Sequence, residues 1–506
     1  MDAHSTAVAA IAANVRYFYD RKKPFRIYHG STNSTRQSQY RRDQMVDTSA
    51  MSHVVKIDTE QKTALVEPNV PMDALVEATL QHGLIPPVVI EFPGVTVGGG
   101  FAGTSGESSS FRHGFFDRTI NWIELVLANG EIVTASSTEN PDLFYGAASS
   151  FGTLGVTTLL ELRLKEAKSY VELTYYPVFS MSEAIEKIQQ ATADSSNDYL
   201  DGIMYSQNSG VVCSGRLTND VKKEVRVQRF TRPADRWFYL HAQKLIKGTR
   251  SPITEAVPIV DYVFRYDRGG FWVAAYAFKY FVTPFNRITR WMLDRFMHTR
   301  VMYHALHKSG FSSQYVVQDV GIPYSKSDEF FQYLDHSFKH YPIWLCPLKC
   351  NVKSIDPALE IMYRKTTLPL PEMLLNFGIW GPGPKDRRKF VEWNRNLERK
   401  VHELEGQKWL YAHTYYTEEE FNQIYDRETY DALRRKYHAT YLPSVYDKVN
   451  IDITAEERAL KESWTLWLLA LFWSIWPLSG LYGVYKAAFG GDYLLPRKTN
   501  KALESQ

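Results

Sequence analysis

The stretch of the sequence best suited to bind a ligand runs from Pro93 to Gly114 and holds seven glycines and four serines in 22 positions. Glycine is retained where backbone must turn sharply or approach another group closely, so this run predicts a backbone wrapped around a ligand with amide groups aimed at an anion. Gly98, Gly100 and Gly103 meet the G-x-G-x-x-G spacing. A Rossmann unit is rejected, because three prolines between Leu84 and Pro93 make a poor central parallel strand.

Composition limits the classes of protein that could carry this stretch. The chain has 506 residues, 44% hydrophobic and 23% charged, as expected for a globular protein of several domains. A net charge of +3 points to no nucleic-acid partner. Cys213, Cys346 and Cys350 form an odd, sparse set, which argues against a disulfide framework and for reducing surroundings. Cys346 and Cys350 lack the further ligands of a zinc site, so we expect packing residues and no metal.

The elements that must position the glycine run read as α+β in order. Ala7–Val15 predicts a short amphipathic helix with no secretory signal. A β-like run then enters the turn Gly30–Ser34, which could cradle a phosphate or be an ordinary turn. The patterns that follow predict a hairpin at 54–67 and then a helix that begins at Pro71. A second hairpin at 123–134 turns at Asn129-Gly130. A short helix and a further strand that ends near 164 come next.

Three ordered motifs resemble the FAD-binding domain of the vanillyl-alcohol-oxidase-type flavoproteins. They are Gly30-Ser31-Thr32-Asn33-Ser34, the P-G-x-T-V-G-G loop at 93–99, and Asp142-Leu143-Phe144 followed by 152–157. The resemblance implies bound FAD, with the first two loops around its pyrophosphate. The residues it assigns to FAD are Gly30, Ser31, Thr32, Asn33, Ser34, Pro93, Gly94, Thr96, Val97, Gly98, Gly99, Gly103, Gly106, Glu107, Ser108, Gly155 and Val156.

The chain departs from this family at the points of covalent attachment. Many members bind the flavin through a histidine in the first loop, where this chain has Asn33, and an amide cannot form that bond. No cysteine lies near Gly106, so the second link of bicovalent members is also missing. We therefore expect non-covalent FAD.

Strings in the second half narrow the resemblance to the Δ24-sterol reductase family; they are 314–319, 341–347, 410–412 and 445–448. The string 106–110 within the glycine run resembles the same family. The resemblance extends from about Ala12 to about Val449. It implies an N-terminal helix at 1–24, a two-subdomain FAD-binding domain at 25–168 and an α+β substrate or cap domain at 169–450. A C-terminal hydrophobic helix at 464–485 and a polar tail at 486–506 complete the expected organisation.

The same resemblance implies the chemistry. A reduced flavin delivers hydride to an isolated side-chain double bond of a sterol or sterol-like lipid, and NADPH reduces the flavin again. Such an alkene also needs a proton from a positioned acid. As a strand, 408–416 would place Tyr411, His413 and Tyr415 on one face, and we take these three as the catalytic candidates. His413 can carry a proton near neutral pH but could equally be a satisfied structural histidine, and the family has aspartate at this position.

Other charged residues leave alternatives open. Glu107 would lie near the flavin as a structural hydrogen-bonding group or as an acid. Arg265 and Arg268 match paired arginines in the family and could bind a nucleotide phosphate or a lipid headgroup, or be solvated surface charges. No separate nicotinamide motif is visible, which suits transient binding of NADPH.

Two stretches suggest contact with a membrane. The apolar run Phe271–Phe285 is followed by four arginines among aromatic residues, which indicates either a partly buried helix pair or a basic amphipathic face. Trp464–Tyr485 is 22 residues without charge, enough as a helix for a membrane span or re-entrant anchor, although Pro477, Gly480 and Gly483 also suit a buried or in-plane helix. We expect an endoplasmic-reticulum membrane protein with a cytosolic catalytic part.

Two other functions remain open at this point. One is an FAD-dependent alcohol or aldonolactone oxidase using oxygen, although the chain lacks the His-Trp-x-Lys motif usual near the end of aldonolactone oxidases. The other is a non-catalytic membrane protein that binds sterol. The substrate itself and the oligomeric state cannot be read from the residues.

Overall fold

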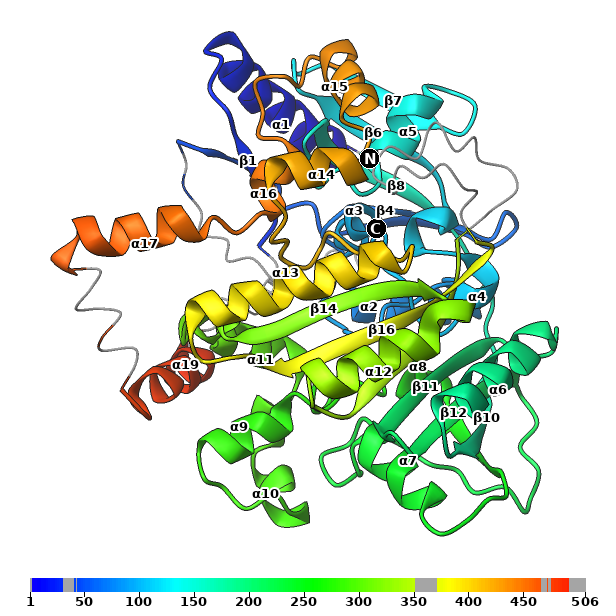
Figure 1. Cartoon of the computed structure of the whole chain (residues 1–506). Coiled ribbons are helices and arrows are strands. Elements are labelled where there is room, and N and C mark those ends of the chain that lie inside the picture. Colours follow the sequence, from blue (N-terminus) through cyan, green and yellow to red (C-terminus); the bar gives the residue numbers. More distant parts are fainter. Residues whose placement is uncertain are drawn as a thin grey trace.

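The computed structural model describes residues 2–30, 41, 43–350, 371–465, 471 and 475–490. The predicted mixture of helices and sheets is confirmed (Figure 1). An amino-terminal body, blue to cyan in Figure 1, contains one sheet, and the green and yellow segments form a second, larger sheet. The first loop, with Ser31, Thr32, Asn33 and Ser34, lies outside the described residues.

The amino-terminal body is built on a five-stranded antiparallel sheet in the order β3-β4-β8-β6-β7. Both predicted hairpins are confirmed as β3–β4 and β6–β7. Two small two-stranded sheets pair β1 with β2 in parallel and β5 with β9 antiparallel. The strands are β1 Arg26–Tyr28, β2 Met45–Asp47, β3 Val54–Asp58, β4 Thr63–Val66, β5 Leu84–Ile85, β6 Ile120–Leu127, β7 Ile132–Ser136, β8 Gly155–Arg163 and β9 Lys165–Glu166.

Helices cover this sheet and carry the glycine run. The first helix, α1, buries Val8, Ile11, Val15 and Phe18 at helical spacing, so it belongs to the core of this body. Part of the glycine run forms α3, whose N-cap Thr96 accepts a hydrogen bond from the Gly99 amide at 3.1 Å. The helices are α1 Asp2–Asp20, α2 Met72–Leu80, α3 Val97–Gly103, α4 Ser110–His113, η1 Phe116–Thr119 and α5 Pro141–Ala147.

The second body is an eight-stranded antiparallel sheet in the order β13-β10-β12-β11-β15-β16-β14-β17. Its strands are β10 Tyr170–Val178, β11 Tyr199–Ser206, β12 Ser209–Thr218, β13 Ile253–Pro258, β14 Tyr315–Pro323, β15 Ile343–Lys349, β16 Met373–Pro382 and β17 Gln407–Lys408. Successive side chains alternate between the two faces. One face packs against α6 Met181–Ala193, α12 Ser327–Ser337 and α13 Arg387–Glu403.

The other face of this sheet shares a continuous core with the amino-terminal body. Around it lie α7 Phe238–Ile246, α8 Ile259–Val263, α9 Ala274–Tyr280, α10 Arg287–Met292, η2 Asp294–Phe296, α11 Thr299–Lys308, η3 Phe311–Ser313 and α19 Leu478–Phe489. The short helix η4 Tyr324–Lys326 instead adjoins α12 on the helix-covered face. The remaining helices are α14 Glu418–Ile424, α15 Arg427–Lys436, α16 Val445–Val449 and α17 Ile453–Glu462. The chain returns to the amino-terminal body here, since Tyr430 donates to Thr153 Oγ1 at 2.6 Å.

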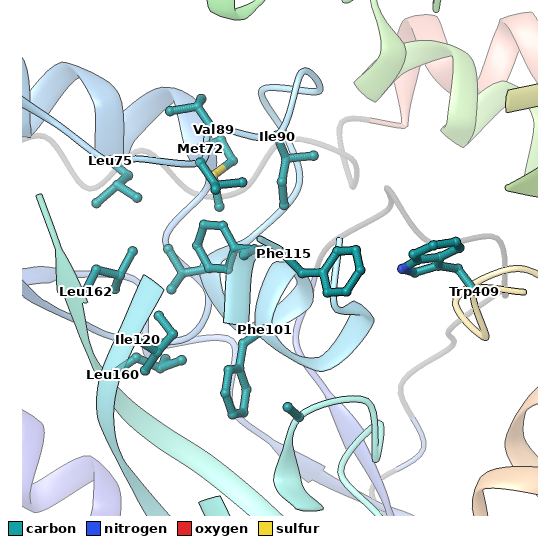
Figure 2. Packing of buried hydrophobic residues seen from close by; sticks show 14 of the residues in the cluster. Met72, Leu75, Val89, Ile90, Phe101, Phe115, Ile120, Leu160, Leu162 and Trp409 are labelled. Atoms are coloured by element: carbon teal, nitrogen blue, oxygen red, sulfur yellow. The ribbon is translucent and has the colours of Figure 1, made fainter. Parts of the chain in front are cut away.

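The loop that joins the two bodies is held by apolar packing as well as by hydrogen bonds. Figure 2 shows the ring of Phe115, part of the core near α2 and α3, facing the indole of Trp409. The two rings meet edge to face with centroids 5.5 Å apart. Trp409 Nε1 also donates to the Thr104 carbonyl at 2.9 Å, so the segment after β17 is fixed against the end of the glycine helix.

The expected strand through Tyr411, His413 and Tyr415 is wrong, because β17 ends at Lys408. Side chains form the hydrogen bonds to the backbone amide and carbonyl groups that strand pairing would need. Lys408 Nζ and Gln318 Nε2 donate to the His413 carbonyl, and the Tyr415 amide donates to Glu398 Oε1 at 2.9 Å. Lys408 and Glu398 form an ion pair at 2.7 Å with both side chains 1% exposed. Hydrogen bonds to this buried pair therefore set the backbone path of residues 409–416.

A single helix over 464–485 is also not what the structure shows. Ile475–Pro477 forms a bend and a turn, and α19 begins only at Leu478. Pro477 lacks an amide hydrogen, which suits a position before a helix. Gly480 and Gly483 allow close packing, since a Cβ on them would meet Tyr280 Cε1 at 2.4 Å and the Ala305 carbonyl at 2.7 Å. Of the helices described, none is both long and apolar enough to cross a membrane.

Lys408→Met should lower the free energy of unfolding by about 3–5 kcal/mol, because it leaves the Glu398 carboxyl buried without its cation. Burial already raises the pKa of Glu398, so the carboxyl is costly to ionise alone. Urea unfolding at neutral pH, followed by tryptophan fluorescence, measures the loss. The double variant Lys408→Met/Glu398→Leu should recover part of it, and an unchanged midpoint in the single variant would contradict this role for the pair.

Candidate functional site

One cavity of about 720 Å³ connects the glycine run to the helices beside the larger sheet. At one end it is lined by Thr96, Gly98, Gly99, Gly103 and Gly106, five of the residues assigned to FAD from the sequence. At the other end the walls are side chains of α9, α11 and α19. The cavity therefore offers a ligand a glycine-lined end and an apolar end in one continuous space.

The glycines along this wall have different reasons to be glycine. A Cβ on Gly98 would lie 2.7 Å from Pro68 Cβ, and one on Gly106 would lie 2.7 Å from Leu348 Cδ2, so packing within the protein forbids larger residues there. At Gly103 the nearest atom would be Ser105 Oγ at 3.3 Å, followed by Tyr411 Cδ1 at 3.6 Å. A Cβ at Gly103 would need the Ser105 side chain to shift by only a few tenths of an ångström, and the space beside Gly103 belongs to the cavity. This is the pattern of a cradle kept clear for a bound group, and it fits FAD.

The other residues assigned to FAD lie around this wall without lining the cavity. Gly30 has φ +72° at the end of the described segment before the first loop. Val97 is in α3, and Pro93 and Gly94 lead toward it. Gly155 and Val156 begin β8, where a Cβ on Gly155 would lie 2.6 Å from the Val126 carbonyl. Glu107 and Ser108 are buried beneath the wall, at 3% and 0% exposed.

Glu107 and Ser108 belong to a hydrogen-bonded cluster between the two bodies. The Glu107 carboxylate accepts from Ser108 Oγ at 2.8 Å and from the Ser109 amide at 2.7 Å, while Ser108 Oγ lies 3.3 Å from Tyr262 Oη. Burial raises the pKa of Glu107 in spite of these donors. Of the two readings of Glu107, the geometry therefore favours the structural one.

Neither Arg265 nor Arg268 is a surface charge. Arg265 Nη2 bonds Asp201 Oδ2 at 2.8 Å, and both side chains are 0% exposed. Asp201 also accepts from Tyr266 Oη at 2.7 Å and Trp344 Nε1 at 3.1 Å. Arg268 pairs with Asp294 at 2.7 Å and is 2% exposed. The predictions that these two arginines bind a phosphate or a lipid headgroup are thus wrong, because both side chains are buried and their guanidinium groups already pair with internal carboxylates.

The alternation of the large sheet turns a set of polar and aromatic residues toward the cavity. On β14, Val316, Val320 and Ile322 join the helix-covered core, which leaves Asp319 on the opposite face. Asp319 stands opposite Gly378 of β16. A Cβ on Gly378 would lie 2.6 Å from Trp380 Cη2, so glycine there makes room for the Trp380 indole to lie beside Asp319.

Asp319 is a buried carboxyl surrounded by hydrogen-bond donors. Asn376 Nδ2 lies 3.2 Å from Oδ1, Trp380 Nε1 lies 3.3 Å from Oδ2, and Tyr411 makes a further side-chain hydrogen bond. The side chain is 5% exposed. Burial outweighs the donors and raises the pKa of Asp319 to about 6. A carboxyl with such a pKa in a cavity wall can exchange a proton near neutral pH.

Aromatic rings continue the wall from Asp319 toward the apolar end. Phe271 is central: it stacks on Tyr266 with centroids 3.9 Å apart, lies 4.2 Å from Trp380 and meets Phe92 at 5.7 Å. Beyond Phe271 the lining comes from Phe278, Phe296 and other apolar residues of α9, η2, α11 and α19. This end of the cavity suits a large apolar ligand.

The three catalytic candidates from the sequence are separated. Tyr411 lines the large cavity beside Asp319 and Gly103. His413 and Tyr415 instead line a small neighbouring pocket together with His307 and Gln318. Asp319 was not weighed from the sequence although it ends the family string Gln314–Asp319, and period-two alternation along that strand is the signal that could have singled it out. Among the described residues, no group of three or more His, Cys, Asp and Glu side chains is arranged to hold a metal.

Comparison with known proteins agrees with this geometry. A family described as "FAD binding domain" matches residues 3–136. The chain is 29% identical over 433 residues to the Delta(24)-sterol reductase of Mus musculus, covering 83% of this chain and 80% of that protein. It is 29% identical over 441 residues to the Delta(24)-sterol reductase of Arabidopsis thaliana, covering 80% and 76%. Cytokinin dehydrogenase 4 of Oryza sativa is 28% identical over 159 residues, about a third of each chain.

The cavity and the matching domain are those of an FAD-dependent oxidoreductase. Within that class, the chain is a relative of the Delta(24)-sterol reductases of animals and plants, and the similarity extends through the larger sheet as well as the FAD-binding part.

Gly103→Val should weaken FAD binding at least about tenfold while the protein still folds, since overpacking typically costs about 1–3 kcal/mol and the side chain would enter the cavity. Flavin fluorescence titration of the flavin-free protein measures the affinity, and circular dichroism reports folding.

Gly98→Val is the matched comparison. Its side chain would collide with Pro68, so this variant should lose folding stability before it loses flavin. If Gly103→Val keeps wild-type flavin affinity, the cradle is not where the flavin binds.

Proposed function

We propose that this protein is an FAD-dependent reductase that saturates the side-chain Δ24 double bond of a sterol or sterol-like lipid with electrons from NADPH. The observation that carries the proposal is one cavity that joins a glycine-lined end to an aromatic, apolar end, with a titratable carboxyl in its wall. The names of the relatives support the same substrate class.

The residues of the glycine-lined end would hold FAD, chiefly Thr96, Gly98, Gly99, Gly103 and Gly106. When bound and reduced, FAD supplies a hydride. We expect no covalent link, because Asn33 replaces the attaching histidine of the family. NADPH has no separate site in this proposal and reduces the flavin by transient binding.

The apolar end suits a sterol more than the substrates of an oxidase. Sugars and small alcohols need several hydrogen-bond partners, whereas these walls are mainly aromatic and aliphatic. An isolated alkene instead needs a dry pocket, a hydride and an acid, and aromatic faces favour the positive charge that develops on its substituted carbon.

Exposed apolar residues lie after α9, in α10, and in and just before α19, next to elements that line this end of the cavity. We call this group the apolar rim; it comprises Val282, Ile288, Trp291, Met292, Trp476, Leu481, Tyr485 and Phe489. The two halves of the rim are joined, since Trp476 Nε1 donates to the Tyr280 carbonyl at 2.9 Å and α19 packs on α11. Leu481 both lines the cavity and is 52% exposed, so the cavity reaches the surface within the rim.

We propose that the apolar rim rests on a phospholipid surface from which the substrate enters. Arg287 and Arg295 are exposed next to it and would meet anionic headgroups. Arg300, expected to join this basic face, instead lies 3.3 Å from Asp73 of the amino-terminal body. In this proposal α19 is an in-plane anchor, and the compartment is the cytosolic side of the endoplasmic reticulum.

The enzymatic proposal is tested with purified protein, NADPH and desmosterol, a sterol with a Δ24 double bond. Mass spectrometry should find product heavier by two hydrogens, formed with stoichiometric NADPH oxidation and without oxygen consumption. Acid precipitation should leave the yellow flavin in the supernatant. Oxygen consumption without saturated sterol would instead indicate an oxidase. If the protein shows neither activity, a non-catalytic sterol-binding protein is favoured.

The double variant Ile288→Asp/Met292→Asp should reduce the vesicle-bound fraction at least about tenfold, because burying each such side chain contributes about 1.5–3 kcal/mol. Flotation with vesicles of neutral and anionic phospholipid measures the bound fraction. Ile132→Asp, at a site of similar exposure on β7, is the control and should float like wild type. Equal flotation of the rim variant and the control would rule out this surface.

A further inference from the structure

We propose that the hydroxyl of Tyr411, supported by the carboxyl of Asp319, donates the proton that completes reduction of the double bond. This inference rests on the proposed function and assigns a role within the same cavity. Both side chains line that cavity, and they reach it from separate elements: Asp319 from β14 and Tyr411 from the loop after β17.

The position of Tyr411 is where a donor is required. Its ring lies beside the glycine-lined end of the cavity, because a Cβ built on Gly103 would be 3.6 Å from Tyr411 Cδ1, and its hydrogen bond to Asp319 also places it against the larger sheet. The loop that carries Tyr411 is fixed on both sides. Trp409 donates to the Thr104 carbonyl at 2.9 Å, and the buried Lys408–Glu398 pair holds the backbone after Tyr411. Such fixation keeps a donor in the geometry that proton transfer needs.

Asp319 is placed to supply Tyr411. The two side chains share a hydrogen bond, and Asn376 and Trp380 hold the carboxyl from the strand beside it. Burial and the neighbouring Asp319 raise the pKa of Tyr411 well above its usual value, so the phenol remains protonated between turnovers. The pKa of Asp319 near 6 allows this carboxyl to take up a proton again from solvent.

The other acids near the cavity fit the role less well. His413 and Tyr415 line the small neighbouring pocket and not the large one. Glu107 lies beneath the wall with its oxygens bonded to Ser108 and Ser109. Glu91 does line the cavity, but its buried Oε1 has no hydrogen-bond partner among the described residues, so no second acid is bonded to that oxygen to return a proton to it.

The step balances in atoms and electrons. The double bond accepts a hydride, with its electron pair, at one carbon. At the other carbon a C–H bond forms as the O–H bond of Tyr411 breaks, and Asp319 transfers its carboxyl proton to Tyr411 Oη. The alkene is reduced by two electrons, the flavin is oxidised, and Asp319 is left as a carboxylate that is protonated before the next turnover.

Rapid mixing of the FAD-loaded protein separates the two half-reactions. Tyr411→Phe and Asp319→Asn should bind FAD and be reduced by NADPH within about threefold of wild type. Reoxidation of the reduced protein by desmosterol without oxygen should slow by about 100-fold or more in Tyr411→Phe, the usual effect of losing a general acid. Tyr175→Phe is the matched control, since it removes a buried hydroxyl that has no hydrogen-bond partner among the described residues and lies away from the cavity.

The pH profile separates proton transfer from a merely structural effect. A carboxyl that must be protonated makes the wild-type reoxidation rate fall as pH rises through its pKa, near 6 in the ligand-free cavity. Asp319→Asn should abolish that fall. Flavin content and the NADPH half-reaction report whether each variant is folded.

Several outcomes would overturn the assignment. A reoxidation rate of Tyr411→Phe within about threefold of wild type would exclude Tyr411 as the donor. An unchanged pH profile in Asp319→Asn would exclude the supporting role of Asp319. Selective loss of reoxidation in Glu91→Gln or His413→Ala would move the donor to that residue. Failure of wild-type protein to reoxidise with the sterol would overturn the proposed function itself, and is distinguishable because no variant is involved.

Discussion

An arginine removed from water holds the two bodies of this protein together. Arg265 faces Asp201 on the inner face of the large sheet, and its neighbours Tyr262 and Ser108 lead directly to Glu107 at the end of the glycine run. Removing one charge from such a pair leaves the other unpaired and is strongly unfavourable, whereas the intact pair fixes geometry. The Leu200 amide adds a bond to the Ser108 carbonyl at 2.7 Å. Polar contacts inside the core therefore fix the position of the glycine-lined wall relative to the sheet that carries Asp319.

Local chemistry made much of the fold predictable. The hairpins at β3–β4 and β6–β7 follow from turn residues between alternating strands, and α2 follows from its apolar spacing and the glycine after it. The FAD-binding part was recognisable because its motifs are contiguous, and the matching family confirms it. The domain boundaries and the roles of the assigned site residues remain predictions.

The parts that sequence reasoning missed depend on contacts between distant residues. The strand expected at 411–415 fails because Lys408, Gln318 and Glu398 take its backbone hydrogen bonds, and those partners lie on three different elements. Asp319 acquires its environment from Asn376, Trp380 and Tyr411, up to 92 positions along the chain. The sequence left Arg265 and Arg268 open as phosphate-binding, headgroup-binding or surface residues, because their partners Asp201 and Asp294 are remote in sequence.

The dual position of α19 has a practical consequence for handling the protein. Leu481 is part of both the cavity wall and the exposed apolar surface, so at this residue the apolar wall of the chamber continues to whatever amphiphile covers that surface. A detergent that shields the exposed residues during extraction can pass a single alkyl tail along the same wall. Detergents with flexible tails should consequently behave as competitors of the substrate, whereas bulky bile-salt-like amphiphiles or lipid nanodiscs leave the chamber accessible.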